Sequence, residues 1–470
     1  MHGGNGTARH AARLCGISLM IPIDSTITEG AVGVLRRAMV WLAMLCAMTG
    51  TARAAALLCV NAPGVVALTD NRGVEIIENG RFDSIFVVRE DQLFAAGSRG
   101  AYRLYDAAGQ SMGDVRFSMI DDTGDALLFR AGRLYGAMNA MGEVLVPAEW
   151  TQLSSDGSGG WLALNSDPLD EQPDEIIRID AEGNQKQTGV YCSGGLGAVL
   201  GGRMVFMDGD GRFGALNAIG GLAVEPTWQY MGPYANGIAK VAGQEGMGVV
   251  DGSGRAVIAP YYPWLERSAT MIAAWDGANV DIYGPQGGQR RVRLSGKVRE
   301  VALAGDDLVV TYEGRTCLYD AYGRLITQDA GKVDYAPGSR GQLIACNGAW
   351  GEKCQWLVNP DGSKASGMFQ QLLPLCAERY AFLEMAGETY DSEVLGRAQT
   401  DWNYGDCRYG LMDARGRILI RARYREIRAL SSDRLLLIGD DRVQIADRNG
   451  VVMKTWITPE SAESSAEANE

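Results

Sequence analysis

Residues 247–262 read MGVVDGSGRAVIAPYY, and the same arrangement occurs three more times in the chain. An aromatic residue or Met stands before a Gly, two apolar residues follow, and an Asp or Asn then precedes a second Gly by three residues. Another aromatic residue stands eight residues after that second Gly. The four copies place these positions at Gly136, Asn139, Gly142 and Trp150, at Gly214, Asn217, Gly220 and Trp228, at Gly248, Asp251, Gly254 and Tyr262, and at Gly410, Asp413, Gly416 and Tyr424.

The Asp or Asn and the second Gly of each copy predict a tight turn between two antiparallel strands. An Asp or Asn at the first position of a type I turn accepts hydrogen bonds from its own backbone, and a Gly three residues later adopts the left-handed conformation that closes a bulged hairpin. We therefore interpret these residues as structural rather than catalytic. The aromatic residues are expected to pack between repeats.

Looser copies of the turn extend this pattern over most of the chain. Spacings of about 33–41 residues, with one of 54, give about eleven units, and a period in this range is typical of solenoids, propellers or arrays. We predict an all-β fold of tandem three-stranded antiparallel repeats that is propeller-like, with an open β-solenoid as the alternative. The first turn position recurs at Asp70, Asp106, Asn139, Asp180, Asn217, Asp251, Asp320, Asn359, Asp413 and Asp447, with a degenerate copy at Gly284–Gly287.

The four complete copies resemble the WG-repeat family of bacterial proteins. Repeats of that family read roughly aromatic-Gly-x-apolar-Asp, x-x-Gly, an apolar strand, Pro and an aromatic residue. Pro147, Pro226 and Pro260 match the pattern, whereas Arg421 stands near the expected Pro and the Trp of the family name is Tyr, Phe or Met here. The resemblance spans about residues 56–454. It implies a repeat architecture and a bacterial source, and it implies no enzymatic activity.

The N-terminal region has the pattern of a secretory signal. Arg36 and Arg37 precede an apolar run over 38–48, and Ala52-Arg53-Ala54 follows as a cleavage sequence. We therefore predict that residues 1–54 are an N-terminal extension plus a signal peptide, with translation beginning near Val34 or Leu35, and that a repeat array follows over 55–456. An uncleaved membrane anchor is the alternative. Residues 457–470 predict an acidic disordered tail, and the expected location is secreted or the extracytoplasmic cell surface.

Composition excludes several classes of function. The net charge of −13 argues against a nucleic-acid binder. Both histidines, His2 and His10, precede the predicted cleavage site, so the mature chain would have no histidine for a catalytic triad or a histidine-ligated metal. No nucleotide-binding motif occurs, and the calcium-like stretch Asp208–Gly211 lacks the closing Glu, so it predicts a turn. We expect no cofactor, no metal and no nucleotide.

Two cysteines form a candidate disulfide. Residues 343–346 and 354–358 predict two strands of one hairpin, which would bring Cys346 and Cys354 across from each other. Two half-buried thiols are the alternative.

The single long interval of 54 residues points to an insertion near 370–406. Long loops on a rigid scaffold are where binding residues gather, and aromatic residues beside carboxylates suit sugar rings. A solvated insertion is the alternative. The candidate binding residues are Tyr380, Tyr390, Asp391, Glu393, Asp401, Trp402 and Tyr404.

These observations predict an exported, non-catalytic binding or scaffold protein. Its β-repeat surface would recognise a protein partner or a cell-envelope glycan. The alternative is an enzyme that works with carboxylates alone, such as a glycoside hydrolase on a propeller scaffold, with Asp391, Glu393, Asp401 and Asp406 as candidates. Contact with a membrane is expected only through an uncleaved signal.

Overall fold

We analysed a computed structural model of the whole chain. It describes residues 57–98, 100–166, 172–193, 195–284, 289–348, 354–376, 378–385 and 407–458. The regular secondary structure in these residues consists of 42 β-strands. Within these ranges, no helix is long and apolar enough to cross a membrane. Residues Ala55–Glu470 form one compact unit.

The described strands form eleven antiparallel sheets, which we call blades 1 to 11 in chain order, and nine of the eleven have four strands. Blades 1 to 4 are β1 (Leu58–Ala62), β2 (Val65–Thr69) and β3 (Glu75–Ile77); β4 (Ser84–Arg89), β5 (Leu93–Ser98), β6 (Ala101–Asp106) and β7 (Ser111–Phe117); β8 (Met119–Asp122), β9 (Leu127–Ala131), β10 (Leu134–Met138) and β11 (Val144–Trp150); and β12 (Gln152–Ser155), β13 (Trp161–Leu164), β14 (Asp174–Ile179) and β15 (Gln185–Cys192). Blades 5 to 8 are β16 (Val199–Leu200), β17 (Arg203–Met207), β18 (Phe213–Asn217) and β19 (Leu222–Trp228); β20 (Tyr230–Met231), β21 (Ile238–Ala242), β22 (Met247–Asp251) and β23 (Ala256–Tyr262); β24 (Trp264–Arg267), β25 (Ile272–Trp275), β26 (Asn279–Tyr283) and β27 (Gln289–Arg293); and β28 (Val298–Ala304), β29 (Asp307–Tyr312), β30 (Arg315–Tyr319) and β31 (Leu325–Ala330). Blades 9 to 11 are β32 (Asp334–Pro337), β33 (Leu343–Cys346) and β34 (Gln355–Val358); β35 (Gln371–Pro374), β36 (Arg379–Met385), β37 (Cys407–Asp413) and β38 (Ile418–Tyr424); and β39 (Glu426–Ala429), β40 (Arg434–Ile438), β41 (Arg442–Asp447) and β42 (Val452–Ile457).

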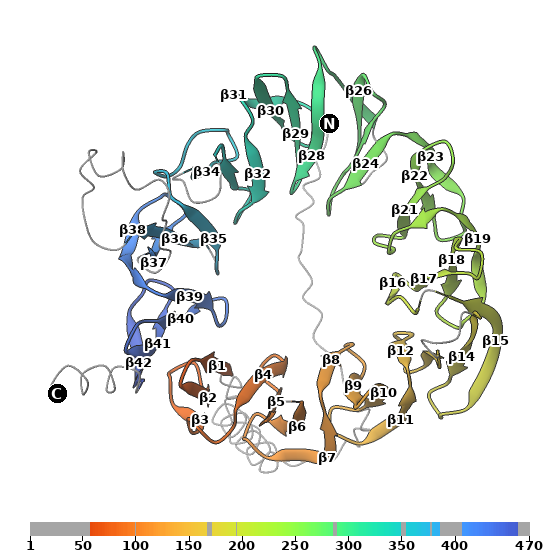
Figure 1. Cartoon of the computed structure of the whole chain (residues 1–470), viewed down its shortest axis with the longest axis vertical. Helices are drawn as coiled ribbons and strands as arrows, with labels where there is room; N and C mark the ends of the chain where they lie inside the picture. Colours follow the sequence, from red (N-terminus) through yellow and green to blue (C-terminus); the bar gives the residue numbers. More distant parts are fainter. Residues whose placement is uncertain are drawn as a thin grey trace, which may run out of the picture. The chain divides into compact units, whose positions relative to one another are not determined.

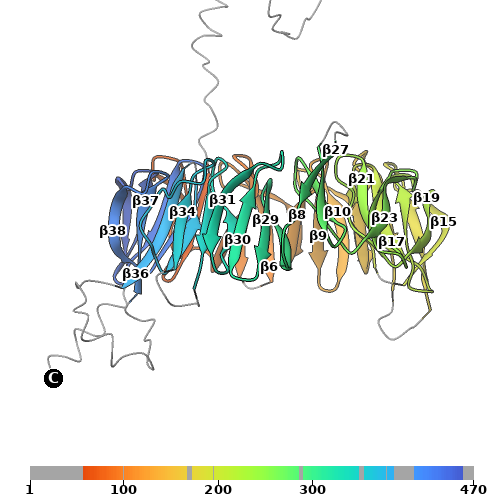
Figure 2. The ribbon, with the colours of Figure 1, turned by 90° about the horizontal axis from the view of Figure 1, so that it is seen from above.

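The blades of this unit follow one another around a ring, as in a β-propeller (Figure 1; Figure 2 gives the side view). The first strand of a four-stranded blade lies nearest the centre and the fourth lies at the periphery, as β12 and β15 of blade 4 illustrate in Figure 1. Both faces of a blade pack against neighbours, so the middle strands are apolar on both faces, as in the fully buried run Leu435–Ile438 of β40. In the outer strand β38, by contrast, only Ile420 and Tyr424 are buried.

The expected all-β, propeller-like fold is confirmed, but the expectation of three strands per repeat is wrong. The missing strand is the innermost one, which is only two residues long in β20 and four in β24. Such a short strand carries one buried aliphatic residue, for example Leu265, and shows no alternation that could be recognised in the sequence. The strand that comes after Trp228 with apolar alternation, β21, is therefore the second strand of the next blade and not the third strand of the same repeat.

The first and last blades meet, so the unit closes on itself instead of extending as a solenoid. Glu75 of blade 1 accepts a hydrogen bond from the Trp456 indole at 2.9 Å and pairs with Lys454 at 2.8 Å. The Arg434 guanidinium donates to the carbonyl of Asn71 at 2.9 Å. The shared apolar cluster consists of Leu58, Val60, Val65, Ala67, Leu436, Ile438, Val443, Ile445 and Trp456.

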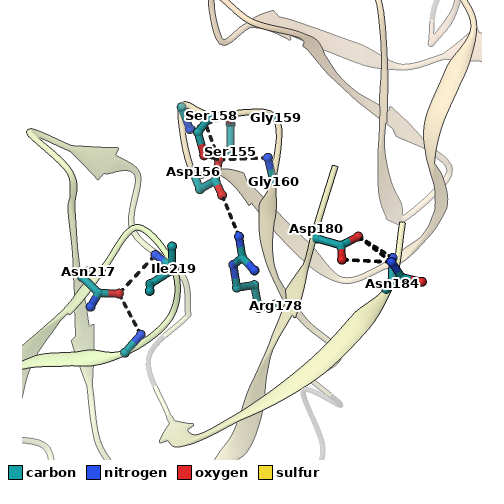
Figure 3. Close-up of polar contacts among 12 residues, drawn as sticks. Ser155, Asp156, Ser158, Gly159, Gly160, Arg178, Asp180, Asn184, Asn217 and Ile219 are labelled. Atoms are coloured by element: carbon teal, nitrogen blue, oxygen red, sulfur yellow. Dashed lines mark hydrogen bonds and ion pairs between the residues drawn. The ribbon is translucent and has the colours of Figure 1, made fainter. Parts of the chain in front are cut away.

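The repeated Asp or Asn closes the turn between the third and fourth strands. Asp251 Oδ1 accepts hydrogen bonds from the backbone N–H groups of Ser253 at 2.9 Å and Arg255 at 3.1 Å. These bonds and the one from the Ser253 hydroxyl lower the pKa of Asp251 to about 2. The backbone N–H groups of Asn184 and Ile219 donate in the same way to Asp180 and Asn217, and Figure 3 shows the contacts of both side chains. These side chains are engaged within their own turns.

The second Gly of each of the four complete copies, and of some looser ones, also contacts the neighbouring blade. Gly254 has a φ of +81°, and a Cβ there would lie 3.0 Å from Val224 of blade 5. A Cβ on Gly142 would lie 2.5 Å from the carbonyl oxygen of Met112 in blade 2. Gly73 of blade 1 approaches Lys454 of blade 11 in the same way, at 3.0 Å. Glycine is needed here both for its left-handed backbone and for the closeness of the preceding blade.

The first Gly of each copy lies opposite a bulge in the fourth strand. In blade 6, Met247 pairs with Tyr262 and Val249 with Ile258, so an irregular stretch of the outer strand crosses Gly248. A Cβ on Gly248 would lie 2.5 Å from the carbonyl oxygen of Ile258. The same shift occurs opposite Gly136, Gly214 and Gly410. The second aromatic residue then packs on the next blade, as Tyr262 does with Leu265.

Candidate functional site

The predicted binding residues divide into one that the structure describes and six that it does not. Tyr390, Asp391, Glu393, Asp401, Trp402 and Tyr404 lie outside the described residues, between β36 and β37. Tyr380 on β36 is fully buried in the interface between blades 9 and 10. We call the packed interface between two adjacent blades a seam. The Tyr380 hydroxyl donates to Gln342 Oε1 at 3.1 Å and accepts from the backbone N–H of Ser339 at 2.7 Å. Tyr380 therefore belongs to the core rather than to a binding surface.

The candidate disulfide pair lies where the sequence places it. Cys346 ends β33 and Cys354 directly precedes β34, and their sulfur atoms are 3.2 Å apart as thiols. The disulfide stays a prediction.

Asp208–Gly211 forms a turn, in which Asp208 Oδ1 accepts from the N–H of Asp210 at 3.0 Å and of Arg212 at 2.8 Å. Among the residues that the structure describes, no group of three or more His, Cys, Asp or Glu side chains is close enough to hold a metal ion.

A pocket of about 710 Å³ opens between the inner strands of blades 7 and 8. β24 and β28 form its two sides, and both lie toward the centre of the ring in Figure 1. The turns that lead from β24 to β25 and from β28 to β29 close one end. Its lining includes Trp264, Glu266, Ser268, Glu300, Val301 and Asp306.

The charged groups around this pocket are paired. Glu266 forms an ion pair with Lys240 at 2.9 Å, and Glu300 forms one with Lys332 at 3.1 Å. Asp306 accepts a hydrogen bond from the Ser268 hydroxyl. The Arg267 guanidinium donates to backbone carbonyls of blade 6, including that of Pro233 at 2.7 Å. Two of the three lining carboxylates, Glu266 and Glu300, therefore have a lysine partner, and the third, Asp306, is bonded to a hydroxyl.

Sequence reasoning missed this pocket because it assigned no strand to the segment that follows each second aromatic residue. The signal that could have found it is Trp264, a large aromatic residue two positions after Tyr262. The neighbouring Glu266 and Glu300 are far apart in the sequence and share a pocket only because blades 7 and 8 stack.

Comparison with known proteins gives no match that carries an argument about this chain. No family model matches the chain, and no curated protein matches it. Among solved structures, AztD of Citrobacter koseri is similar with a TM-score of 0.27 and 10% identity, over 66% of this chain and 93% of that one. PorZ, a bacterial surface component of the type-IX secretion system of Porphyromonas gingivalis, is similar with a TM-score of 0.23 and 12% identity, over 84% and 70%. The Neurospora crassa Pan2 WD40 domain has a TM-score of 0.26 and 13% identity, over 48% and 85%. Scores this low carry no argument about function.

Proposed function

We propose that this chain is an exported, non-catalytic binding protein of the WG-repeat type, whose propeller recognises a protein partner or a cell-envelope glycan. The observation that carries the proposal is that the repeated residues make contacts within the fold itself. The repeated Asp and Asn side chains bond their own turns, and the repeated Gly residues fill seams. The repeat thus builds a scaffold, and the surfaces that remain for recognition are the inner strands and the connections between strands.

Export is supported by the signal-like sequence pattern, which ends at Ala54. The compact unit begins at the next residue, Ala55. Expression of the whole chain in a bacterial host, followed by cell fractionation and N-terminal sequencing, tests this part. We expect the protein outside the cytoplasm with Ala55 as its first residue. A cytoplasmic protein that keeps residues 1–54 would contradict export.

Co-sedimentation with purified bacterial cell walls tests the binding part. Residues 55–470 are mixed with insoluble walls beside the Asp401→Ala/Trp402→Ala double variant of the predicted insertion. Wild type in the pellet, with the variant in solution, would establish glycan binding through the insertion. Wild type in the pellet together with the variant would place binding elsewhere on the ring. Wild type left in solution would redirect the search to a protein partner.

A carboxylate-only enzyme is the second candidate, and one observation favours it. Burial and the nearby carboxylates of Asp320 and Asp306 raise the pKa of Asp307 to about 6, and a raised carboxyl pKa is what a general acid needs. Asp307 directly follows Asp306, which lines the pocket between blades 7 and 8. Release of reducing sugars from cell-wall glycan by wild type, abolished in Asp307→Asn, would favour this candidate over binding alone.

A further inference from the structure

We propose that the pocket between β24 and β28 binds a saccharide, with one sugar ring stacked on Trp264 and its hydroxyls bonded to Glu266, Glu300 and Ser268. The inference rests on the proposed binding function and specifies the ligand class and its location.

The size of the pocket and one of its walls suit a small organic ligand. Its volume of about 710 Å³ falls within the ~300–1,000 Å³ typical of small-molecule sites. Trp264, Val301 and Leu303 supply apolar surface to the lining. Trp264 and Leu303 pack against a buried cluster that spans blades 7 and 8 and includes Val301, so this wall is supported by the core. A rigid aromatic face is what the apolar C–H side of a sugar ring stacks on.

Each of the two glutamates of the lining places a hydrogen-bond acceptor next to a lysine donor. Each carboxylate has about four acceptor positions, so an ion pair with a single ammonium leaves Glu266 and Glu300 able to accept further hydrogen bonds. Their side chains are 47% and 53% exposed despite the pairs with Lys240 and Lys332. A sugar hydroxyl both donates and accepts, so it can bond a carboxylate and the neighbouring ammonium together.

The charge balance decides between ligand classes. The carboxylates of Glu266 and Glu300 are matched by Lys240 and Lys332, and Arg267 is held by carbonyls of blade 6. A cationic ligand would have to compete with Lys240 and Lys332 for Glu266 and Glu300, and an anionic ligand would face the three carboxylates of the lining. A neutral, hydroxyl-rich ligand requires neither change. The combination of a supported indole with carboxylates that already have lysine or hydroxyl partners therefore favours a saccharide.

Calorimetric titration with maltotriose, cellotriose and tri-N-acetylchitotriose tests the proposal on residues 55–470. Trp264→Ala removes the stacking face, and Glu300→Gln removes one acceptor oxygen while keeping the shape of the side chain. Tyr322→Ala is the control, because Tyr322 is an aromatic residue of blade 8, one of the two blades that form the pocket, and is 59% exposed on the turn between β30 and β31, away from the lining. We expect wild type and Tyr322→Ala to bind at least one of these sugars equally. Trp264→Ala should bind it at least about tenfold more weakly, and Glu300→Gln several-fold more weakly.

Three results would overturn the proposal. The first is that wild type binds none of the three sugars. The second is that Trp264→Ala, shown to be folded by its melting temperature, binds as wild type does. The third is the decisive one if Trp264→Ala does not fold: Glu300→Gln binds the sugar with the same affinity as wild type. If wild type fails with these sugars but still sediments with cell walls, the pocket inference fails while the proposed binding function stands.

Discussion

Two seams of the ring use the same tyrosine position with different chemistry. Between blades 6 and 7, the Tyr262 hydroxyl donates to the buried carboxylate of Asp281 at 2.9 Å, and Arg291 donates to that carboxylate at 2.6 and 2.7 Å. Between blades 10 and 11, the Tyr424 hydroxyl donates to Gln444 Oε1 at 3.0 Å. One seam thus encloses an ion pair, and the other a neutral amide.

Asp281 and Gln444 occupy the strand position that is Gly in the four complete copies. They lie where the outer strand pairs without a shift, Asp281 with Arg291 and Gln444 with Thr455. Gly248, by contrast, lies under a bulge that leaves no room for a Cβ. A regular outer strand therefore permits a side chain that reaches the tyrosine of the preceding blade. The difference teaches that the seam can be held by backbone shape or by a polar side chain.

Truncation of Asp281 and of Gln444 to Ala should produce the largest difference in stability between the two seams. Asp281→Ala leaves Tyr262 and Arg291 without their shared acceptor, and loss of one partner of a buried ion pair costs about 3–5 kcal/mol. Because Arg291 is half exposed and keeps Asp276 as a second carboxylate partner, solvent screening lowers this cost, and we expect about 2–3 kcal/mol of local stability to be lost. Gln444→Ala removes only neutral hydrogen bonds and should cost about 1–2 kcal/mol. Hydrogen exchange of β26 and β41 measures both, and equal losses would contradict the comparison.

The sequence predicted the features of this fold that are set by local chemistry. The turns at Asp251 and Asp413 depend on residues a few positions apart, so their spacing revealed the number of blades. Ring closure depends on the rotation between successive blades, which no local pattern carries. The contact of Glu75 with Trp456 joins opposite ends of the chain and could not be anticipated.

The candidate site was less predictable for a related reason. Tyr380 was assigned to a binding insertion because an aromatic residue of a seam has the same appearance in the sequence as an exposed one. Its burial depends on Gln342 and Ser339 of the neighbouring blade. The pocket between β24 and β28 likewise exists only through blade stacking, so Trp264 indicates an additional aromatic residue in the sequence but not the second wall that makes it part of a pocket.

The turn glycines offer a second, smaller test of how a seam is held. Gly450 has a φ of +86°, and a Cβ there would lie 2.4 Å from Ile420 Cδ1 across the seam between blades 10 and 11. Gly183 has nearly the same φ, +85°, but nothing lies within 4 Å of its Cβ position. Gly183→Ala should cost about 1 kcal/mol, the strain of a left-handed Ala.

Gly450→Ala adds the displacement of a buried Ile side chain, for a total of about 2 kcal/mol. Thermal unfolding of both variants measures these losses. A Gly183→Ala variant as unstable as Gly450→Ala would show that the turn conformation alone, without the contact between blades, sets the cost.

Acidification should give the smallest loss of stability. This loss is the most specific to the seam between blades 6 and 7, which contains the charged side chains. The hydrogen bonds from Arg291 lower the pKa of Asp281 most, burial opposes them, and the Tyr262 hydroxyl lowers the pKa further. A carboxyl whose pKa is lower in the folded state adds stability above its unfolded value of about 4, and this stability is lost as the pH falls through the lowered pKa. Hydrogen exchange of β26 should therefore speed up below about pH 4, beyond the intrinsic change.

The turn carboxylates Asp251 and Asp413 also have lowered pKa values, so acid alone weakens both seams. Asp281→Asn separates the contributions, because an amide keeps the shape of the side chain and does not titrate. The variant should be less stable than wild type at neutral pH, and the difference should shrink as the pH falls. The neutral Gln444 seam serves as the internal reference, since exchange of β41 should change equally in both proteins. A gap between wild type and Asp281→Asn that stays constant from pH 7 to about pH 2 would mean that Asp281 holds the seam through shape and hydrogen bonding, not through its charge.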